Sequence, residues 1–415
     1  MATSPNVPTS TTDQENNRAR VAELAAAGVM VWSPERVYIG PEVNLEFISP
    51  GAELINAIVR GASTRIGARS RIGTSGIAVL SECQVGEGVE LGAGSYDGAT
   101  MLDGVKVRGF GELRQSCLLE EGVELGHNVG LKNTLLTSTI IAGSNINFCD
   151  VVMTGGRSRS DHSEIGSGVV HLNFDPRRDK FGSLLGNADG VLLKSAPIFV
   201  GGQCGLVAPV WVGFGAVIAA GSVVREDVPE KALFLTNPRP YQPRRYDPYA
   251  YPKSIRTQVM KTARLIGALC AIGAWYRYIR APFAEGGQKA LYVAGENRLA
   301  DMARVRSREL AATLDRLESA LASHSDWSSE KAGDHSVLLR AKSAVIRYLS
   351  DVYFEVIKGP PEEFLRAYES LRKGATHIDT ISAISDGATS AASKWLCQIE
   401  TVVEGRVEMC LKKAV

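Results

Sequence analysis

The stretch VGGQCGLVAPVWVGFGAVIAAGSVV, residues 200–224, carries an aliphatic residue at every sixth position. The repeating residues are Val200, Leu206, Val212, Ile218 and Val224. Aliphatic residues at this period, often followed by Gly and another small residue, are typical of a parallel β-helix built from hexapeptides. Three short strands then form a triangular coil of about 18 residues, and each strand places one aliphatic side chain inside.

Shorter series with the same period lie nearer the N-terminus. They comprise Ile66 and Ile72; Val79, Val85 and Leu91; Leu113, Leu119, Leu125 and Leu131; and Ile140, Ile146 and Val152. An amphipathic helix explains them poorly, because its period is about 3.6 residues and each glycine would cost it about 1 kcal/mol. We expect the β-helix to span residues 30–235, with irregular coils near residues 96–112 and 153–195.

The sequence changes character on both sides of this region. Residues 1–29 predict a disordered tail and a short helix, and residues 236–252, rich in Pro and Tyr, predict an extended linker. Helical spacing follows within residues 253–415. It is carried by Leu310, Leu314, Leu317 and Leu321, and by Leu396, Ile399, Val403, Val407 and Cys410. We therefore predict a β-helix followed by an all-α C-terminal domain of four or five helices. This domain is expected either to pack beneath the β-helix or to reinforce an oligomer.

Composition excludes several classes of partner. A formal net charge of +1 gives no general attraction to nucleic acid or to acidic membranes. The most apolar stretch, residues 265–275, is too short to span about 30 Å of hydrocarbon, and the N-terminus lacks the features of a secretory signal. The seven cysteines are scattered without a C-x-x-C pair, which favours a reducing cytoplasm over disulfides or zinc.

One segment interrupts the repeats with polar and charged residues. It reads GGRSRSDHSEIGSGVVHLNFDPRRDKFGSLLG, residues 155–186, and contains two histidines and four arginines. An imidazole, with an ordinary pKa near 6.5, can take a proton from an attacking amine or hydroxyl at neutral pH. We therefore expect this segment to form part of an active site.

Residues 125–229 resemble a known family of enzymes. The segments LGHNVGLKNTLL, EIGSGVVHLNFD and GGQCGLVAPVWVGFGAVIAAGSVVREDVPE are similar to the left-handed β-helix acetyltransferase half of the bacterial bifunctional enzyme that makes UDP-N-acetylglucosamine. The resemblance implies a left-handed coil, a homotrimer and acetyl-CoA or another acyl-CoA as co-substrate. No Gly-rich nucleotide-binding opening precedes the repeats, so we expect no uridyl transfer.

The resemblance implies a binding site for a small anionic acceptor. Arg114 and Lys132 match the family's phosphate-binding Arg and Lys in local sequence and in their separation by the length of one coil. One coil apart, they are expected to stack on adjacent strands, where two cations repel each other unless an anion lies between them. Two solvated surface cations are the alternative. Asn173 matches the family's Asn, and Lys180 lies one residue from the position of its next Lys.

The resemblance also implies a slot for coenzyme A between subunits. The matching small residues are Gly205, Ala208, Ala219, Ala220 and Gly221. Small residues would let a pantetheine arm lie against the backbone, although the corners of a β-helix favour small residues for their own conformation. Arg157, Arg159, Arg177 and Arg178 either form solvated loops or bind the phosphates of the cofactor or of a nucleotide-linked sugar, for which guanidinium groups are well suited.

The chain departs from the family at the catalytic base. In the family the histidine lies about a dozen residues after the matched Lys, and this chain has Ser144, Asn145 and Asn147 there and no His. His162, with Asp161 or Glu164 to orient it, is the first candidate to replace that base, and His171 is the second. An inward, structural role is the alternative for His171, and His127 is expected at the surface. No spacing of acidic or Cys residues supports a metal site.

Two functions follow from these observations. The first is an N- or O-acyltransferase that moves an acyl group from a CoA thioester to an amino sugar phosphate, a sugar nucleotide or a specialised metabolite. The second is a non-catalytic trimeric scaffold that binds a sugar nucleotide, or a different reaction at the same cleft between subunits. We expect no nucleic-acid partner and no membrane association for either.

Overall fold

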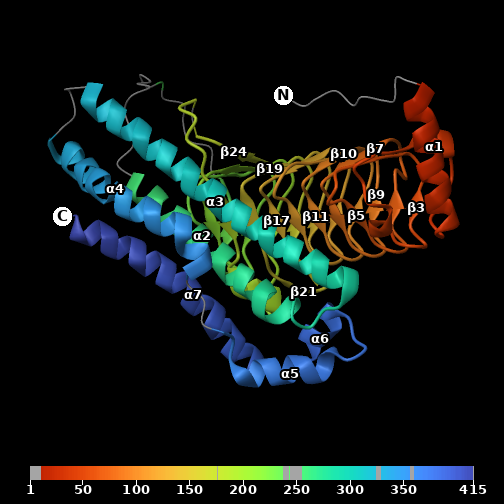
Figure 1. Ribbon diagram of the computed structural model, residues 1–415. Helices are drawn as coiled ribbons and strands as arrows, with labels where there is room; N and C mark the ends of the chain where they lie inside the picture. Colours follow the sequence, from red (N-terminus) through yellow and green to blue (C-terminus); the bar gives the residue numbers. More distant parts are fainter. Residues whose placement is uncertain are drawn as a thin grey trace.

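The computed structural model describes residues 11–174, 176–236, 243, 255–323, 329–355 and 359–414. It consists of a parallel β-solenoid, here called the prism, and a group of helices laid along one of its faces (Figure 1). The predicted β-helix followed by a helical region is confirmed. Most of the predicted linker at residues 236–252 and the first ten residues lie outside the described residues.

Three parallel sheets form the faces of the prism. Sheet A contains, in order, β1 (Met30–Val31), β3 (Glu53–Leu54), β6 (Arg71–Ile72), β9 (Glu90–Leu91), β12 (Lys106–Val107), β15 (Glu124–Leu125), β18 (Ile141–Ala142), β23 (Glu164–Ile165), β26 (Phe199–Val200), β29 (Val217–Ile218) and β31 (Leu233–Phe234). Sheet B contains β2 (Val37–Ile39), β4 (Ala57–Arg60), β7 (Ala78–Ser81), β10 (Gly94–Asp97), β13 (Gly111–Leu113), β16 (Val129–Lys132), β19 (Asn147–Cys149), β24 (Val170–Leu172), β27 (Gly205–Val207) and β30 (Val223–Val224). Sheet C contains β5 (Arg65–Ile66), β8 (Gln84–Val85), β11 (Thr100–Met101), β14 (Leu118–Leu119), β17 (Leu135–Leu136), β20 (Val151–Met153), β25 (Ser183–Leu185) and β28 (Trp211–Val212).

The chain passes from sheet A to B to C in each coil and turns at three edges, here called the A/B, B/C and C/A corners. Inward side chains stack from coil to coil, as Leu113, Leu131 and Phe148 do on sheet B. The step from Leu131 to Phe148 is one residue shorter than the step from Leu113 to Leu131. This shorter coil shifts the period-six pattern after Leu131.

Two residues of the predicted inward series face outward instead. Val79 is only partly buried, and its neighbour Leu80 fills the interior. Val152 packs against the helices, while Met153 belongs to the core of the prism. Residues 96–112, predicted to be irregular, form a regular coil because Tyr96 fills the interior of β10, which pairs with β13. Irregular structure is confined to the later segment, where β21 (Gly156–Ser158) and β22 (Asp161–His162) form an antiparallel hairpin.

Six helices follow the prism within the described residues. They are α2 (Ile255–Trp275), which continues as a π-helical turn over Tyr276–Arg280, α3 (Gly286–Ser323), α4 (Ser329–Glu355), α5 (Glu362–Arg372), α6 (His377–Ala383) and α7 (Asp386–Lys413). In the predicted leucine series of α3, Leu310, Leu314 and Leu317 are buried and Leu321 is partly buried, and most of the series in α7 is buried. None of the described helices is long and apolar enough to cross a membrane.

The short helix predicted within residues 1–29 is α1 (Thr11–Ala26). It includes residues at the end of the segment that was predicted to be a disordered tail, and it packs beside β2.

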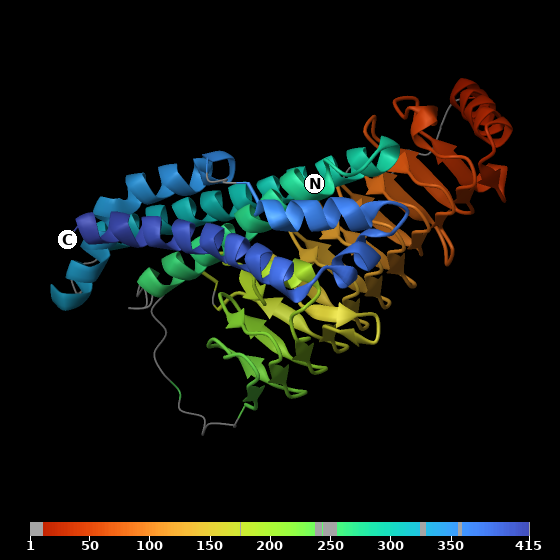
Figure 2. The ribbon, with the colours of Figure 1, turned by 90° about the horizontal axis from the view of Figure 1, so that it is seen from below.

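The helices cover sheet C (Figure 2), whose later strands carry apolar residues on both faces. In β14, Leu119 points into the prism and Leu118 joins the core of the helices. Leu135 and Leu184 repeat this outward contact on later coils. The helical region thus lies along the side of the prism, rather than beneath it as one of the predicted arrangements had it.

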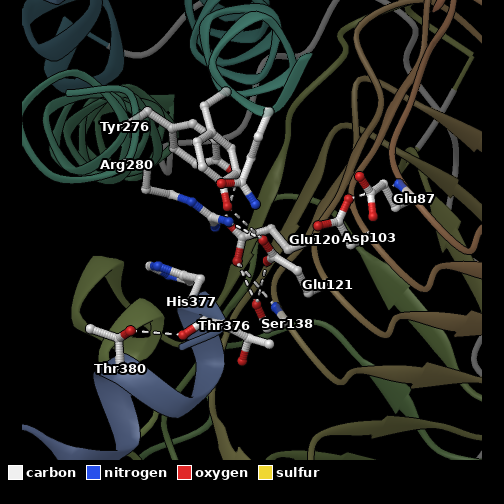
Figure 3. Close-up of polar contacts among 12 residues, drawn as sticks. Glu87, Asp103, Glu120, Glu121, Ser138, Tyr276, Arg280, Thr376, His377 and Thr380 are labelled. Carbon is white, nitrogen blue, oxygen red and sulfur yellow. Dashed lines mark hydrogen bonds and ion pairs between the residues drawn. The ribbon is translucent and has the colours of Figure 1, made fainter. Parts of the chain in front are cut away.

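A buried ionic cluster fastens the helices to the prism. The Arg280 guanidinium, fully buried, pairs with Glu120 and Glu121 at the C/A corner (Figure 3). Glu120 also accepts a hydrogen bond from the Tyr276 hydroxyl at 2.7 Å, and both carboxylates accept bonds from Ser138. Burial raises the pKa of the Glu120 carboxyl, and the charge of Arg280 opposes that rise.

Glu400 of α7 forms a second buried contact between helix and prism. Its carboxylate accepts a hydrogen bond of 2.7 Å from the Ala188 backbone N–H. Burial raises the pKa of Glu400 from 4.5 to about 7, only partly offset by that bond. Because the folded pKa lies above the unfolded one, its stabilising contribution is present below pH 4.5 and lost as the pH rises through about 7.

We therefore expect Glu400→Gln to flatten the dependence of stability on pH. Between pH 5 and pH 8 the wild-type protein should lose about 2 kcal/mol more of its unfolding free energy than the variant does. Urea unfolding at the two pH values measures this difference. Glu363→Gln, at an exposed position of α5, is the matched control, and equal losses in the wild type and in Glu400→Gln would contradict the expectation.

Candidate active site

The residues predicted from the sequence to bind acceptor and donor gather on sheet B and its two corners. Helices cover sheet C, and α1 packs beside β1 and β2 at the N-terminal end of the prism. The outer face of sheet B carries Arg114, Lys132 and Gly205 on its later coils. This face is called the B face below.

Arg114 and Lys132 lie on adjacent coils, as their separation by one coil length predicts. Leu113 of β13 pairs with Leu131 of β16, so the two cationic residues that follow are neighbours across the sheet. The Arg114 Nη2 atom lies 3.6 Å from the Cys149 Sγ atom, two coils further along the prism. Its Nε atom is 3.9 Å from Glu112, whose side chain is half exposed. No ion pair of Lys132 is present among the described residues, so this pair of cations lacks a close, buried carboxylate.

Asn173 and Lys180 begin and end a loop that crosses the B/C corner after β24. Asn173 is exposed, and the side chain of Lys180 is half exposed, 3.9 Å from Glu309 of α3. Arg178, in this loop, has a positive φ of 67°, and its backbone carbonyl accepts a hydrogen bond from Arg316. Arg177 is partly buried and Arg178 exposed. The loop therefore brings Asn173 and Lys180 to the edge of the B face, next to α3.

The predicted donor-binding residues occupy the last coils. Gly205 lies in β27, beside Val170 and Val223 on the outer face of sheet B. Ala208 follows the same strand and is buried. Ala219, Ala220 and Gly221 form the A/B corner, where Gly221 has a φ of +74° that favours glycine. Gly205 and the A/B corner thus lie at one end of the B face, whereas Ala208 packs in the core shared with the helices.

His171 points into the prism. Its backbone pairs with Leu206, and its ring lies edge-on to the inward Phe148 with centroids 6.5 Å apart. The Nε2 atom is 2.8 Å from the Ser183 hydroxyl of sheet C. Burial lowers the pKa of His171 to about 4, and the positive charge of Arg306 adds to the effect. This environment matches the structural alternative for His171, since a base for acyl transfer should reach the open face.

His162 lies at the C/A corner, on the hairpin formed by β21 and β22. Its Nδ1 atom is 2.9 Å from the Arg159 carbonyl, and its Nε2 atom is 3.9 Å from Glu164. Arg159 is held in turn by Glu124 at 2.5 Å, and Arg157 pairs with Asp161. Within one chain, His162 and these two arginines are therefore on a different corner from Arg114 and Lys132.

His127 forms a contact that the sequence interpretation missed. Its exposed ring lies at the A/B corner, with the Nδ1 atom 2.8 Å from the Ser144 hydroxyl of the next coil. Ser144 is one of the residues in the region where the resemblance predicts the family's histidine. The two residues are 17 positions apart, the length of the shorter coil, so that spacing could have indicated their contact. The strand that starts beside His127, β16, ends at Lys132.

The described residues contain no group of three or more His, Cys, Asp or Glu side chains arranged to hold a metal ion. The Cys149 thiol, next to Arg114, has its pKa raised, chiefly by burial. The chemistry available on the B face is therefore that of two cations, exposed amide and hydroxyl groups, and one nearby imidazole.

This architecture defines a hexapeptide-repeat β-solenoid with stacked cations on an open face. No family model matches the chain. Three curated relatives are each named bifunctional protein GlmU, and the resemblance predicted from the sequence is confirmed. The relative from Nitratidesulfovibrio vulgaris is 31% identical over 218 residues, which are 51% of this chain and 42% of that protein. Those from Carboxydothermus hydrogenoformans and Acinetobacter baumannii are 30% and 29% identical over 235 and 228 residues.

The match to these two relatives covers 54% and 53% of this chain. The chain spans less than half the length of the relatives it matches, since the matched parts are 42% to 45% of their sequences. The similarity therefore concerns about half of each protein, and the activity of the whole relative is not transferred by it.

Proposed function

We propose that this protein is an acyltransferase that moves an acetyl or other acyl group from a CoA thioester to a small anionic acceptor. The stacked pair of Arg114 and Lys132 on the open B face is the observation that carries the proposal. Similarity to GlmU proteins over half of the chain supports it. The default acceptor is an amino sugar phosphate such as glucosamine 1-phosphate.

In the proposed reaction, the phosphate of the acceptor binds between the Arg114 and Lys132 side chains. Asn173 and Lys180 bind the sugar from the loop at the B/C corner. The acceptor amine attacks the thioester carbonyl, an amide bond forms, and the carbon–sulfur bond breaks; an acceptor hydroxyl would form an ester in the same way. A protein base takes the proton of the amine, and the released thiolate of CoA is protonated. Backbone N–H groups are suited to stabilise the oxyanion that forms on the way.

The donor belongs at the small residues of the last coils. Gly205 on β27, Ala208 just after it, and Ala219, Ala220 and Gly221 at the A/B corner are proposed to bind the pantetheine arm, because small side chains let a ligand approach the backbone. Arg177 and Arg178 are proposed to bind phosphates of the donor, because guanidinium groups form paired hydrogen bonds with phosphate oxygens. No metal takes part in this scheme.

The proposal includes a homotrimer. The outer face of sheet A changes from charged residues on the early coils to the apolar column of Phe199, Val217 and Leu233, which are 40%, 40% and 70% exposed. Such a column favours association with another copy of the chain. A neighbouring copy could also bring its C/A corner, and with it His162, to a B face. The proposed location is the cytoplasm, and all seven cysteines are free thiols.

Three histidines are proposed as the base. His162 would act across the subunit boundary, and His171 would have to leave its inward position. His127 is on the edge of the B face itself, at the opposite end of β16 from Lys132, at most about 17 Å away along the strand. In the tautomer whose Nδ1–H donates to Ser144, the Nε2 atom is left as the proton acceptor. Geometry thus favours His127.

Release of free thiol from acetyl-CoA tests the proposal. We expect release that depends on glucosamine 1-phosphate or another anionic amino sugar. Lys132→Met should lower kcat/KM for the acceptor about 10-fold to 100-fold, since a hydrogen bond to a charged group contributes about 1.5–3 kcal/mol. Lys394→Met, at an exposed position of α7, is the control.

Calorimetry with acetyl-CoA separates the two functions weighed for this fold. No binding of any CoA ester, together with binding of a sugar nucleotide, would contradict the acyltransferase and favour a non-catalytic scaffold. Equal kcat/KM in Lys132→Met and Lys394→Met would contradict the role of the stacked cations.

A further inference from the structure

Helix α3 runs along the B/C corner from the early coils to the acceptor loop. Near its start, Arg298 donates from Nη2 to the Glu82 carbonyl at 3.2 Å. In the middle, the buried Arg306 pairs with Asp150 at 2.5 Å. Near its end, Arg316 pairs with Asp179 of the loop at 2.8 Å. The helix therefore follows the stack of coils and fixes the loop that carries Asn173 and Lys180.

A groove of about 870 Å³ lies between α3 and this corner. Lys132, Gln115 and Asn133 line it from the prism, and Arg304 and Arg308 line it from α3. The two arginines are four residues apart, so they lie on the same face of the helix, and both are exposed. Lys132 thus belongs both to the stacked cations and to the groove.

The charges of the groove are arranged unevenly. Arg304 pairs with Asp301 at 2.5 Å, whereas no ion pair of Arg308 is present in the part of the chain that the structure describes. Lys132, Arg304 and Arg308 are the cations at one end of the groove, which is also lined by the carboxylates of Asp301, the partner of Arg304, and of Glu309, which lies 3.9 Å from Lys180. Lys132 and Arg308, for which the described residues show no ion pair, repel each other unless an anion lies between them. The other end is lined by the carboxylates of Glu82 and Asp97, which accept hydrogen bonds from hydroxyl groups.

We propose that this groove binds the nucleotide part of a nucleoside diphosphate-linked amino sugar. The diphosphate contacts Lys132, Arg304 and Arg308, and the ribose hydroxyls point towards Glu82 and Asp97. The volume is in the range of about 300–1,000 Å³ that holds drug-sized ligands, more than a sugar monophosphate requires. The inference rests on the proposed function, because it takes Lys132 as the residue at which the acceptor enters the groove. It assigns the helical region a role in acceptor binding.

Isothermal titration calorimetry of the full chain with UDP-glucosamine and glucosamine 1-phosphate tests the inference. The wild type should bind UDP-glucosamine at least about 10-fold more tightly than the monophosphate, since each paired contact of arginine with phosphate adds affinity. The double variant Arg304→Gln/Arg308→Gln should bind UDP-glucosamine about 10-fold more weakly and glucosamine 1-phosphate within about 2-fold of the wild type. Arg347→Gln/Arg366→Gln, two exposed arginines outside the groove, is the control of equal charge.

Equal affinity of the wild type for the two ligands would overturn the inference. So would a double variant that binds UDP-glucosamine like the wild type, or that loses both ligands equally. The proposed function fails separately, if the chain binds no CoA ester. A protein that binds UDP-glucosamine with the expected pattern but no CoA ester would keep the groove and lose the acyl transfer.

Discussion

Replacing Arg280 by methionine is expected to lower the free energy of unfolding by about 3–5 kcal/mol. The guanidinium is fully buried between Glu120 and Glu121 and lies 4.2 Å from the centre of the Tyr292 ring. Without it, two carboxylates stay buried beside each other with no cation, and their desolvation is uncompensated. Since domains are stable by only about 5–15 kcal/mol, the helices should separate from sheet C at a much lower temperature or urea concentration.

Two variants make this prediction specific. Arg366→Met breaks an ion pair with Glu362 in which both side chains are about three-quarters exposed, and it should cost less than about 1 kcal/mol. The triple variant Glu120→Gln/Glu121→Gln/Arg280→Met removes all three charges and should be more stable than the single variant. Urea unfolding followed by circular dichroism measures each difference. A loss below about 1 kcal/mol in Arg280→Met would contradict the anchoring role of the cluster.

Replacing the catalytic base is expected to have the second large effect. General base catalysis contributes about 10²-fold to 10⁴-fold, so His127→Asn should lower kcat of acyl transfer by at least about 100-fold if His127 is the base. The contact between its Nδ1 atom and Ser144 orients the ring, and Ser144→Ala should therefore lower kcat by a smaller factor. The release of thiol from acetyl-CoA at saturating acceptor is the measurement.

The same assay compares the other two histidines. His162→Asn should leave kcat nearly unchanged unless a neighbouring copy supplies that ring, in which case mixing it with a Lys132→Met variant should restore activity in mixed trimers. His171→Asn should lower stability more than kcat, because the ring is packed against Phe148 and Ser183. Full activity of His127→Asn would remove His127 as the base and leave His162 as the remaining candidate.

The fold was predictable because its signal is local. Each coil repeats one inward residue per strand, so the series from Val200 to Val224 shows the prism without any knowledge of distant contacts. Val152 was assigned to the wrong face because the inward residues Phe148 and Met153 are five positions apart rather than six. The sequence also contains a signal that sheet C is covered on its outer face. Leu118–Leu119 and Leu135–Leu136 are apolar pairs on sheet C, and paired apolar residues indicate a strand buried on both sides.

The site was predictable only in part. Arg114 and Lys132 follow from a spacing of one coil. His127 and Ser144 are 17 residues apart, one residue less than a full-length coil. Comparing residues separated by a full coil therefore does not reveal their contact. The groove beside α3 joins Lys132 to Arg308, which lies in the helical region far along the sequence. No periodicity relates a residue of the β-solenoid to a residue of the helices, because their contact is decided by how the helices dock on sheet C.

Electron density for a bound acceptor tests the central claim most directly. A crystal grown with glucosamine 1-phosphate and CoA should show the phosphate within hydrogen-bonding distance of both Arg114 and Lys132 on the outer face of sheet B, with the amine towards the A/B corner. A phosphate bound elsewhere on the chain, with both of those side chains exposed to solvent alone, would contradict the account.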